Sequence, residues 1–252
     1  MIILKNNMEI EYMKRAGKVV GETLARIEDA IKPGITTADL DRIAEEFIVK
    51  QGAKPSFKGY HGFPASICAS VNNEVVHGFP TSTVLQEGDI VSVDCGAILN
   101  GYHGDAARTF PIGKISSDAE NLIRVTKESF FKGLEFAKVG NRLYDVSYAI
   151  QQHVESFGYS VVRDFVGHGI GKQLHEDPEV PNFGRPGRGP KLLHGMVLAI
   201  EPMVNIGKYN VEVQSNGWTV VTADGTLSAH YENTVAILDN GPEILTFSDR
   251  GE

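Results

Sequence analysis

The sequence predicts an α+β fold made of two similar halves, each with antiparallel strands flanked by a pair of helices. Residues 32–52 match residues 138–158 at a constant offset of 106, with Lys, Asp and two Gly at equivalent positions. Residues 85–98 match residues 192–204 at an offset of 107, and each segment contains an apolar β-like run followed by a carboxylate. Because the offsets are nearly equal, one unit is used twice, and we expect the halves to pack about an approximate two-fold axis.

Two helices are expected at the start of each half, because apolar residues recur there at helical spacing between turn signals. The first helix should end at Lys32-Pro33-Gly34, and Thr37 is a suitable N-cap for the second. The expected helices span residues 8–31, 37–51, 117–137 and 142–157. The expected strands span residues 66–71, 74–77, 89–95, 102–111, 159–166, 196–204, 209–214, 218–222 and 232–238.

The composition is that of an ordinary globular protein, with 42% hydrophobic and 22% charged residues. The formal net charge of −8 argues against nucleic acid as the main ligand. Cys68 and Cys95 are the only cysteines, which gives no disulfide framework and fits a reducing compartment. The N-terminal apolar run is too short for a signal peptide, and no segment approaches the ~20 apolar residues of a membrane span. We therefore expect a cytoplasmic protein with no membrane partner.

Four carboxylates stand beside or within expected strands, where apolar residues are usual. They are Asp94 after IVSV, Asp105 in HGDAARTF, Glu201 after VLAI and Glu232 before NTVAIL. A single carboxylate at a strand end is usually solvated. Four of them, with Asp94 and Glu201 equivalent in the internal repeat, indicate a shared site.

The expected hairpin at Asn100-Gly101 places two of these carboxylates on one face of a sheet. With the turn at these residues, Asp94 faces Ala107 and Asp105 faces Gly96. The two carboxylates are then diagonal neighbours, with backbones about 7–8 Å apart, and both can reach one cation. Cys95 points to the opposite face by strand alternation, so we assign it to packing.

Buried carboxylates repel one another and take up protons unless cations neutralise them. Four carboxylates and a neutral His168 carry a charge of about −4, which two divalent ions would balance. This oxygen-rich set favours Mn²⁺, Fe²⁺ or Co²⁺ and is also compatible with Zn²⁺. Two ions about 3.5–4 Å apart can hold a water between them and lower its pKa toward ~7, which makes a hydroxide able to attack a carbonyl.

Histidines beside glycines complete the expected site. Glycines flank His168 in FVGHGIGKQLHEDP and allow close backbone approach, while His175 follows seven residues later. His175 is placed to donate a hydrogen bond to a developing oxyanion. His77, in NNEVVHGFP, also precedes a glycine at the end of a short expected strand.

These motifs resemble those of type I methionine aminopeptidases. The five segments VDCGA, GYHGDAARTF, GHGIG, LAIEPM and AHYENT occur in order, and the resemblance covers about residues 3 to 248. It implies the pita-bread fold, described as creatinase/aminopeptidase-like. It also implies a cytosolic metalloexopeptidase, a methionyl aminopeptidase that removes the initiator methionine from nascent polypeptides and prefers a small second residue. Neither a zinc-finger extension nor the type II insertion after the metal histidine is apparent, so we expect a bacterial-type enzyme.

The resemblance also assigns roles to individual residues. The implied metal ligands are Asp94, Asp105, His168, Glu201 and Glu232. Asp105 and Glu232 would bridge the two ions, and Glu201 would also shuttle a proton. His175 would polarise the scissile carbonyl and stabilise the gem-diolate, while His77 would contact the scissile amide or the second substrate residue.

The substrate methionine side chain is expected in a pocket rich in aromatic residues, because sulfur–aromatic contacts are favourable. The implied lining residues are Tyr60, His61, Phe63, Cys68 and Trp218. Asn72 in VNNEVVHG matches the monovalent-cation loop of the family. We expect one catalytic domain over residues 1–252, with repeats at roughly 8–112 and 117–240, and a monomeric state. The acidic charge neither requires nor excludes ribosome contact.

Two alternatives stay open at this point. The first is a prolidase or aminopeptidase P of the same fold, although these carry a large N-terminal domain for which the roughly 60 residues before the pocket segment leave no space. The second is a binding protein with an inactive site, although all five ligands are present here. Chelation by EDTA separates an enzyme from such a binding protein.

Overall fold

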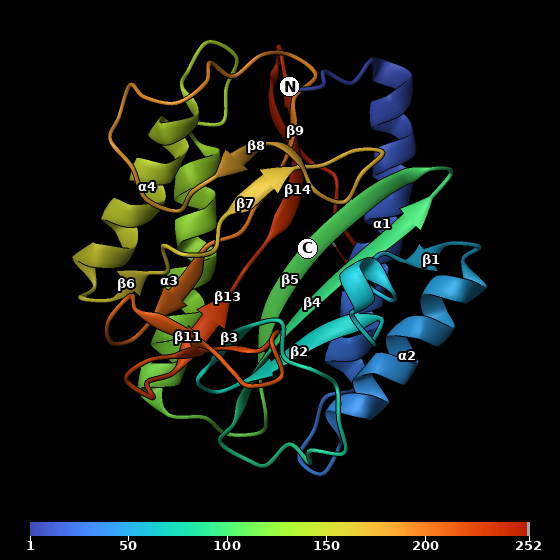
Figure 1. The fold of residues 1–252 in the computed structure, drawn as a ribbon, viewed down its shortest axis with the longest axis vertical. Helices are drawn as coiled ribbons and strands as arrows, with labels where there is room; N and C mark the ends of the chain where they lie inside the picture. Colours follow the sequence, from blue (N-terminus) through green and yellow to red (C-terminus); the bar gives the residue numbers. More distant parts are fainter. Residues whose placement is uncertain (251–252) are drawn as a thin grey trace.

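Two helix pairs lie on opposite sides of the molecule, with the strands between and across them (Figure 1). The structure is a computed structural model and describes residues 1–250. The helices are α1 (Asn7–Ala30), α2 (Thr37–Lys50), α3 (Ser117–Leu134) and α4 (Leu143–Ser156), and a short 3₁₀ helix covers Tyr60–Gly62. All four expected helices are confirmed. Thr37 was the wrong N-cap, because the Thr36 side chain accepts the Asp39 N–H and Asp39 in turn accepts the Thr36 N–H. Over residues 1–250, no helix combines the length and the apolar character needed to cross a bilayer.

Fifteen strands form four sheets within the described residues. They are β1 (Lys54–Pro55), β2 (Ile67–Val71), β3 (Glu74–Val76), β4 (Ile90–Leu99), β5 (Tyr102–Pro111), β6 (Ser160–Val161), β7 (Gly167–Gly169), β8 (Glu176–Val180), β9 (Val197–Ile200), β10 (Met203–Asn205), β11 (Val211–Val213), β12 (Val220–Thr222), β13 (Ser228–His230), β14 (Asn233–Leu238) and β15 (Gly241–Ile244). Each expected strand overlaps an observed one. The strand expected at 159–166 is only two residues long, and the one expected at 196–204 is interrupted at Glu201-Pro202. Strands β1, β7, β8, β13 and β15 were not predicted.

Each half has its own sheet and its own apolar core. In the first half, β4 pairs with β1, β2 and β5, and α1 and α2 cover it through residues such as Ile27 and Leu40. In the second half, the order is β15-β14-β9-β7-β8, and α3 and α4 supply Leu122 and Ile150. The ladders are all antiparallel. Burying such side chains contributes about 1.5–3 kcal/mol each, so both halves contribute to stability.

The internal repeat seen in the sequence has a direct structural counterpart. The Gly34 N–H donates to the Leu85 carbonyl at 2.8 Å, and the Gly140 N–H donates to the Leu192 carbonyl at 3.0 Å. Gly34 is equivalent to Gly140 and Leu85 to Leu192, so the same hydrogen bond occurs once in each repeat. In both repeats it connects the turn before a helix to the segment before a strand. The prediction of an α+β fold with two related halves is confirmed by this arrangement.

Close packing of α1 brings the first sheet into position for the site. A Cβ at Gly17 would lie 2.3 Å from the Leu245 carbonyl oxygen, and a Cβ at Gly104 would lie 2.7 Å from the Gly17 nitrogen. Real Cβ atoms do not approach so closely, so only glycine lets α1 and β5 touch along their backbones. This contact fixes the strand that carries Asp105.

Hydrogen bonds across the centre join the two halves beside Asp105. The Asp105 N–H donates to Thr234 Oγ1 at 3.0 Å, and the same hydroxyl donates to the Asp105 carbonyl at 2.9 Å. Nearby, the Glu232 N–H donates to the Ala107 carbonyl at 2.9 Å. Residues about 130 positions apart in the chain are therefore held next to one another at the start of β14.

Candidate metal centre

The hairpin of β4 and β5 sets the first two carboxylates in the register that the sequence predicted. Asp94 pairs with Ala107, and Gly96 pairs with Asp105. Asn100 and Gly101 form the turn with positive φ angles of 53° and 80°. Asp94 and Asp105 therefore lie diagonally on one face of the sheet.

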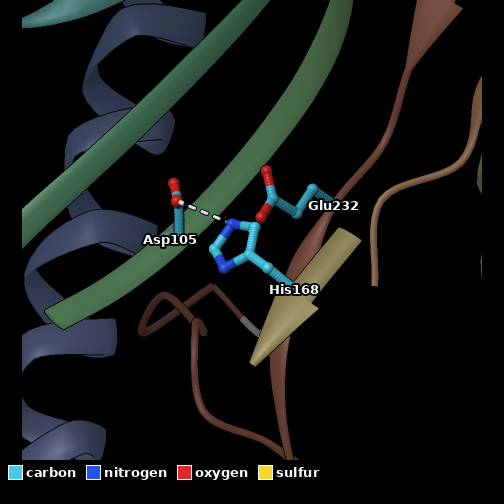
Figure 2. A group of neighbouring side chains, drawn as sticks. All are labelled: Asp105, His168 and Glu232. Carbon is cyan, nitrogen blue, oxygen red and sulfur yellow. Dashed lines mark ion pairs between the residues drawn. The ribbon is translucent and has the colours of Figure 1, made fainter. Parts of the chain in front are cut away.

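Three residues from different elements converge beside this hairpin, as Figure 2 shows. Asp105 comes from β5, His168 from β7, and Glu232 from the residue just before β14. One ligand atom from each lies within 4.8 Å of the other two, and His168 Nε2 lies 3.9 Å from Asp105 Oδ2. Glu201, after β9, places Oε1 3.7 Å from the same His168 nitrogen. A second group of three, formed by Glu201, His230 and Glu232, meets the same 4.8 Å criterion.

Glycines around His168 explain how an imidazole reaches this position. A Cβ at Gly167 would lie 2.3 Å from the Ala199 carbonyl oxygen, and one at Gly169 would lie 2.1 Å from the Asp177 carbonyl oxygen. Only glycine therefore allows β7 to fit between β8 and β9. His168 Nδ1 lies 2.9 Å from the Gly169 carbonyl and donates to it. This bond fixes the tautomer, so that Nε2 keeps a lone pair directed at the carboxylates.

Burial changes the acid strengths of the group. Burial raises the pKa of Asp94 to about 7. Burial, followed by the charges of neighbouring carboxylates, raises the pKa values of Asp105, Glu201 and Glu232 well above their ordinary range. Burial also lowers the pKa of His168 to about 3, so its ring is neutral at physiological pH. Without a cation, these buried carboxyl groups keep their protons at pH values at which free carboxyl groups in water have lost them.

Buried polar atoms without partners show that these residues fit a divalent cation. Asp94 Oδ1, Asp105 Oδ1 and Glu232 Oε1 are buried and have no hydrogen-bond partner within residues 1–250. Unsatisfied carboxylate oxygens are costly in a protein interior, and a cation would satisfy several at once. Carboxylate oxygens with one neutral imidazole suit Mn²⁺, Fe²⁺, Co²⁺ or Zn²⁺.

His175 lies at the edge of this group with its orientation fixed. Its ring centroid lies 4.2 Å from that of His168. Its Nδ1 lies 2.7 Å from the Tyr60 hydroxyl, and burial lowers the pKa of the ring below its ordinary value. In the tautomer in which the Tyr60 hydroxyl donates to Nδ1, the neutral ring carries its proton on Nε2, which is the proton that a hydrogen bond to an oxyanion needs.

One cavity of about 320 Å³ adjoins the carboxylates. All twelve site residues expected from the sequence line it, namely Tyr60, His61, Phe63, Cys68, His77, Asp94, Asp105, His168, His175, Glu201, Trp218 and Glu232. The ring centroids of Phe63 and Trp218 lie 5.2 Å apart, and those of His77 and Trp218 lie 6.4 Å apart. The cavity therefore has a carboxylate–imidazole side and an aromatic side.

His230 is the residue that sequence reasoning missed. It belongs to the second possible ligand group, with Nε2 3.7 Å from Glu201 Oε2 and 3.9 Å from Glu232 Oε2. The signal was present in AHYENT, because residues two apart in an extended chain point to the same side. Phe165 and Leu174 also line the cavity and were not expected there.

Comparison with known proteins agrees with this geometry. A profile for metallopeptidase family M24 matches residues 11–239. A methionine aminopeptidase of Clostridium acetobutylicum is 73% identical over 250 residues, which cover 99% of this chain and 100% of the relative. The chain belongs to the methionine aminopeptidases of this family. Methionine aminopeptidase 1 of Bacillus subtilis is 56% identical over 98% of this chain and 99% of its own length.

Solved structures show the same relationship. The crystal structure of methionine aminopeptidase from Thermotoga maritima has a TM-score of 0.97 and 50% identity, covering 98% of this chain and 100% of that one. Prolidase from Pyrococcus furiosus shares the fold, with a TM-score of 0.80 at 23% identity, and covers 98% of this chain but only 66% of its own. These two likenesses confirm the predicted pita-bread fold.

Proposed function

We propose that this protein is a metal-dependent aminopeptidase that removes the N-terminal methionine from polypeptides with a small second residue. The observation that carries the proposal is the buried cluster of four carboxylates and one imidazole beside an aromatic cavity of about 320 Å³. The methionine aminopeptidase relatives, identical at up to 73% of positions, support the same activity. Nascent polypeptide N-termini are the proposed substrates.

The proposed ligands for the cofactor are Asp94, Asp105, His168, Glu201 and Glu232. Four carboxylate charges match two divalent ions, so we propose that these residues would hold two. Divalent ions bound there would supply Lewis acidity toward a carbonyl and lower the pKa of a bound water. Mn²⁺, Fe²⁺, Co²⁺ and Zn²⁺ all fit these donors.

The chain's own residues would orient the substrate and move the proton. Glu201, whose Oε1 lies 3.7 Å from His168 Nε2, is the proposed proton carrier. His175, with Nδ1 held by the Tyr60 hydroxyl, would donate from Nε2 to the substrate carbonyl oxygen as negative charge develops. His77, beside Trp218, would contact the scissile amide or the second residue.

The aromatic side of the cavity is the proposed pocket for the methionine side chain. Its proposed residues are Tyr60, His61, Phe63, Cys68 and Trp218. The edge-on packing of Phe63 against Trp218 gives ring edges and faces for contact with a thioether sulfur. Burial raises the pKa of the Cys68 thiol well above its ordinary value, so Cys68 would act here as a small apolar wall.

Four further properties are proposed from the sequence. Asn72 is the proposed monovalent-cation residue, and its carbonyl now accepts the Ser228 N–H at 2.9 Å. A single catalytic domain over residues 1–252, a monomeric state and a cytoplasmic location are also proposed. The formal net charge of −8 neither requires nor excludes contact with the ribosome.

Hydrolysis of Met-Ala-Ser with added Mn²⁺ or Co²⁺, after removal of metal by EDTA, tests the proposed function. We expect methionine release that EDTA abolishes and the metal restores, and little cleavage of X-Pro dipeptides. Preferential cleavage of X-Pro would favour the prolidase alternative, and no cleavage of either substrate with Mn²⁺ or Co²⁺ would favour a binding protein.

A further inference from the structure

His230 is a buried imidazole for which the proposed chemistry has no role. Its residue exposure is 1%, and its Nε2 has no hydrogen-bond partner among the described residues. A buried polar atom without a partner destabilises the folded state. A native fold that keeps such an atom usually has a ligand or a function for it.

Two strands from different halves hold His230 in place. The His230 N–H donates to Thr109 Oγ1 at 2.9 Å, and the Thr109 hydroxyl donates to the His230 carbonyl at 2.9 Å. On its other side, His230 pairs with Met203 of β10. The imidazole is therefore presented from a rigid position rather than from a loop.

The distances around Nε2 suit a shared cation better than a direct hydrogen bond. Nε2 lies 3.7 Å from Glu201 Oε2 and 3.9 Å from Glu232 Oε2, both beyond hydrogen-bond length. Two ligands at about 2.1 Å from one ion are separated by up to about 4.2 Å. His168 Nε2 shows the same spacing, 3.7 Å from Glu201 Oε1 and 3.9 Å from Asp105 Oδ2.

Glu201 thus lies between two imidazoles, with His168 nearest one of its oxygens and His230 nearest the other. We propose that His230 is a sixth metal ligand, which supplies Nε2 to a divalent cation held together with Glu201 and Glu232. This inference rests on the proposed metal centre and adds a second nitrogen to it. The set is independent of His168, because Glu201, His230 and Glu232 form a group of three by themselves.

A second imidazole changes which cations the centre prefers. Nitrogen ligands favour Co²⁺ and Zn²⁺, whereas purely carboxylate surroundings suit Mn²⁺ and Mg²⁺. Loss of the His230 nitrogen should therefore weaken Co²⁺ binding more than Mn²⁺ binding. A role as a hydrogen-bond donor to Glu201 would not produce this difference.

Calorimetric titration of the metal-free protein with Co²⁺ and, separately, with Mn²⁺ tests the inference. The variants are His230→Gln, which keeps a side-chain donor, and His230→Ala, which keeps none. His194→Gln is the matched control, because His194 is exposed and lies away from the carboxylate cluster, paired with Asp239. We expect both His230 variants to bind Co²⁺ at least about tenfold more weakly, with a smaller loss for Mn²⁺ and an altered visible spectrum of bound Co²⁺.

A His230→Gln variant with unchanged Co²⁺ affinity and spectrum would overturn the inference. If the variants fail to fold, NMR of the wild-type protein with ¹⁵N-labelled imidazoles gives the answer. A shift of the His230 Nε2 resonance on Zn²⁺ binding to that of a coordinated nitrogen supports the inference, and an unchanged resonance refutes it. Release of methionine from Met-Ala-Ser is measured separately, so failure of the proposed activity is distinguishable from failure of His230 ligation.

Discussion

Replacing Lys5 by methionine is expected to destabilise the protein and to misplace the loop that carries His175. Lys5 precedes α1, and its Nζ lies 2.5 Å from Glu176 Oε2 and donates to the Ile3 carbonyl at 3.0 Å. The side chains of Lys5 and Glu176 are only 3% and 4% exposed. Glu176 directly follows His175, so this ion pair joins the N-terminal segment to the site.

The magnitude follows from the burial of the pair. Removing one partner of a buried ion pair leaves the other charge unpaired and costs about 3–5 kcal/mol. The same substitution at Lys58, whose pair with Glu45 is 48% and 36% exposed, should cost less than about 1 kcal/mol. The double variant Lys5→Met with Glu176→Gln should recover part of the loss, because no charge is then left buried.

Urea unfolding of the wild type and these variants measures the free energy of unfolding, and kcat on Met-Ala-Ser reports the position of His175. We expect Lys5→Met to lose about 3–5 kcal/mol and to lower kcat. A Lys5→Met variant no less stable than Lys58→Met would refute the reasoning, as would a double variant less stable than both single variants.

Other predictions concern the cavity. Asp94→Ala should abolish methionine release and reduce metal content measured by elemental analysis, because a buried ligand is lost; unchanged metal and rate would remove Asp94 from the centre. His175→Ala should retain metal but lower kcat by on the order of 10²–10³, as for loss of an oxyanion donor; loss of metal would instead make His175 a ligand. Burial lowers the pKa of His77 to about 4. The folded state then binds fewer protons than the unfolded state, so stability is lost as pH falls from about 6.5 toward 4. The wild type should lose about 2–3 kcal/mol more than His77→Gln between pH 7 and 4.5 in urea unfolding, and parallel losses would contradict this.

Much of the fold and the site was readable from local pattern. The Asn100-Gly101 turn fixed the hairpin register, and with it the diagonal placement of Asp94 and Asp105. The internal repeat indicated that Asp94 and Glu201 occupy equivalent positions in the two halves. These features depend on residues close in sequence or on a repeated motif, so one chain suffices to find them.

The missed features depend on contacts between distant segments. Strand β7 is three residues long and mostly glycine, so its propensity is low, and it exists because β8 and β9 pair with it on both sides. The break at Glu201-Pro202 splits one apolar run into two sheets, which alternation alone does not indicate. His230 lies in β13, which was not predicted, and only the fold shows that its Nε2 is buried beside Glu201.

Anomalous diffraction from crystals grown with Co²⁺ tests the central claim most directly, because it locates the metal without assuming a role for any residue. The account predicts anomalous density enclosed by Asp105, His168, Glu201 and Glu232. Density bound only at surface carboxylates, with this cluster free of metal, would contradict it.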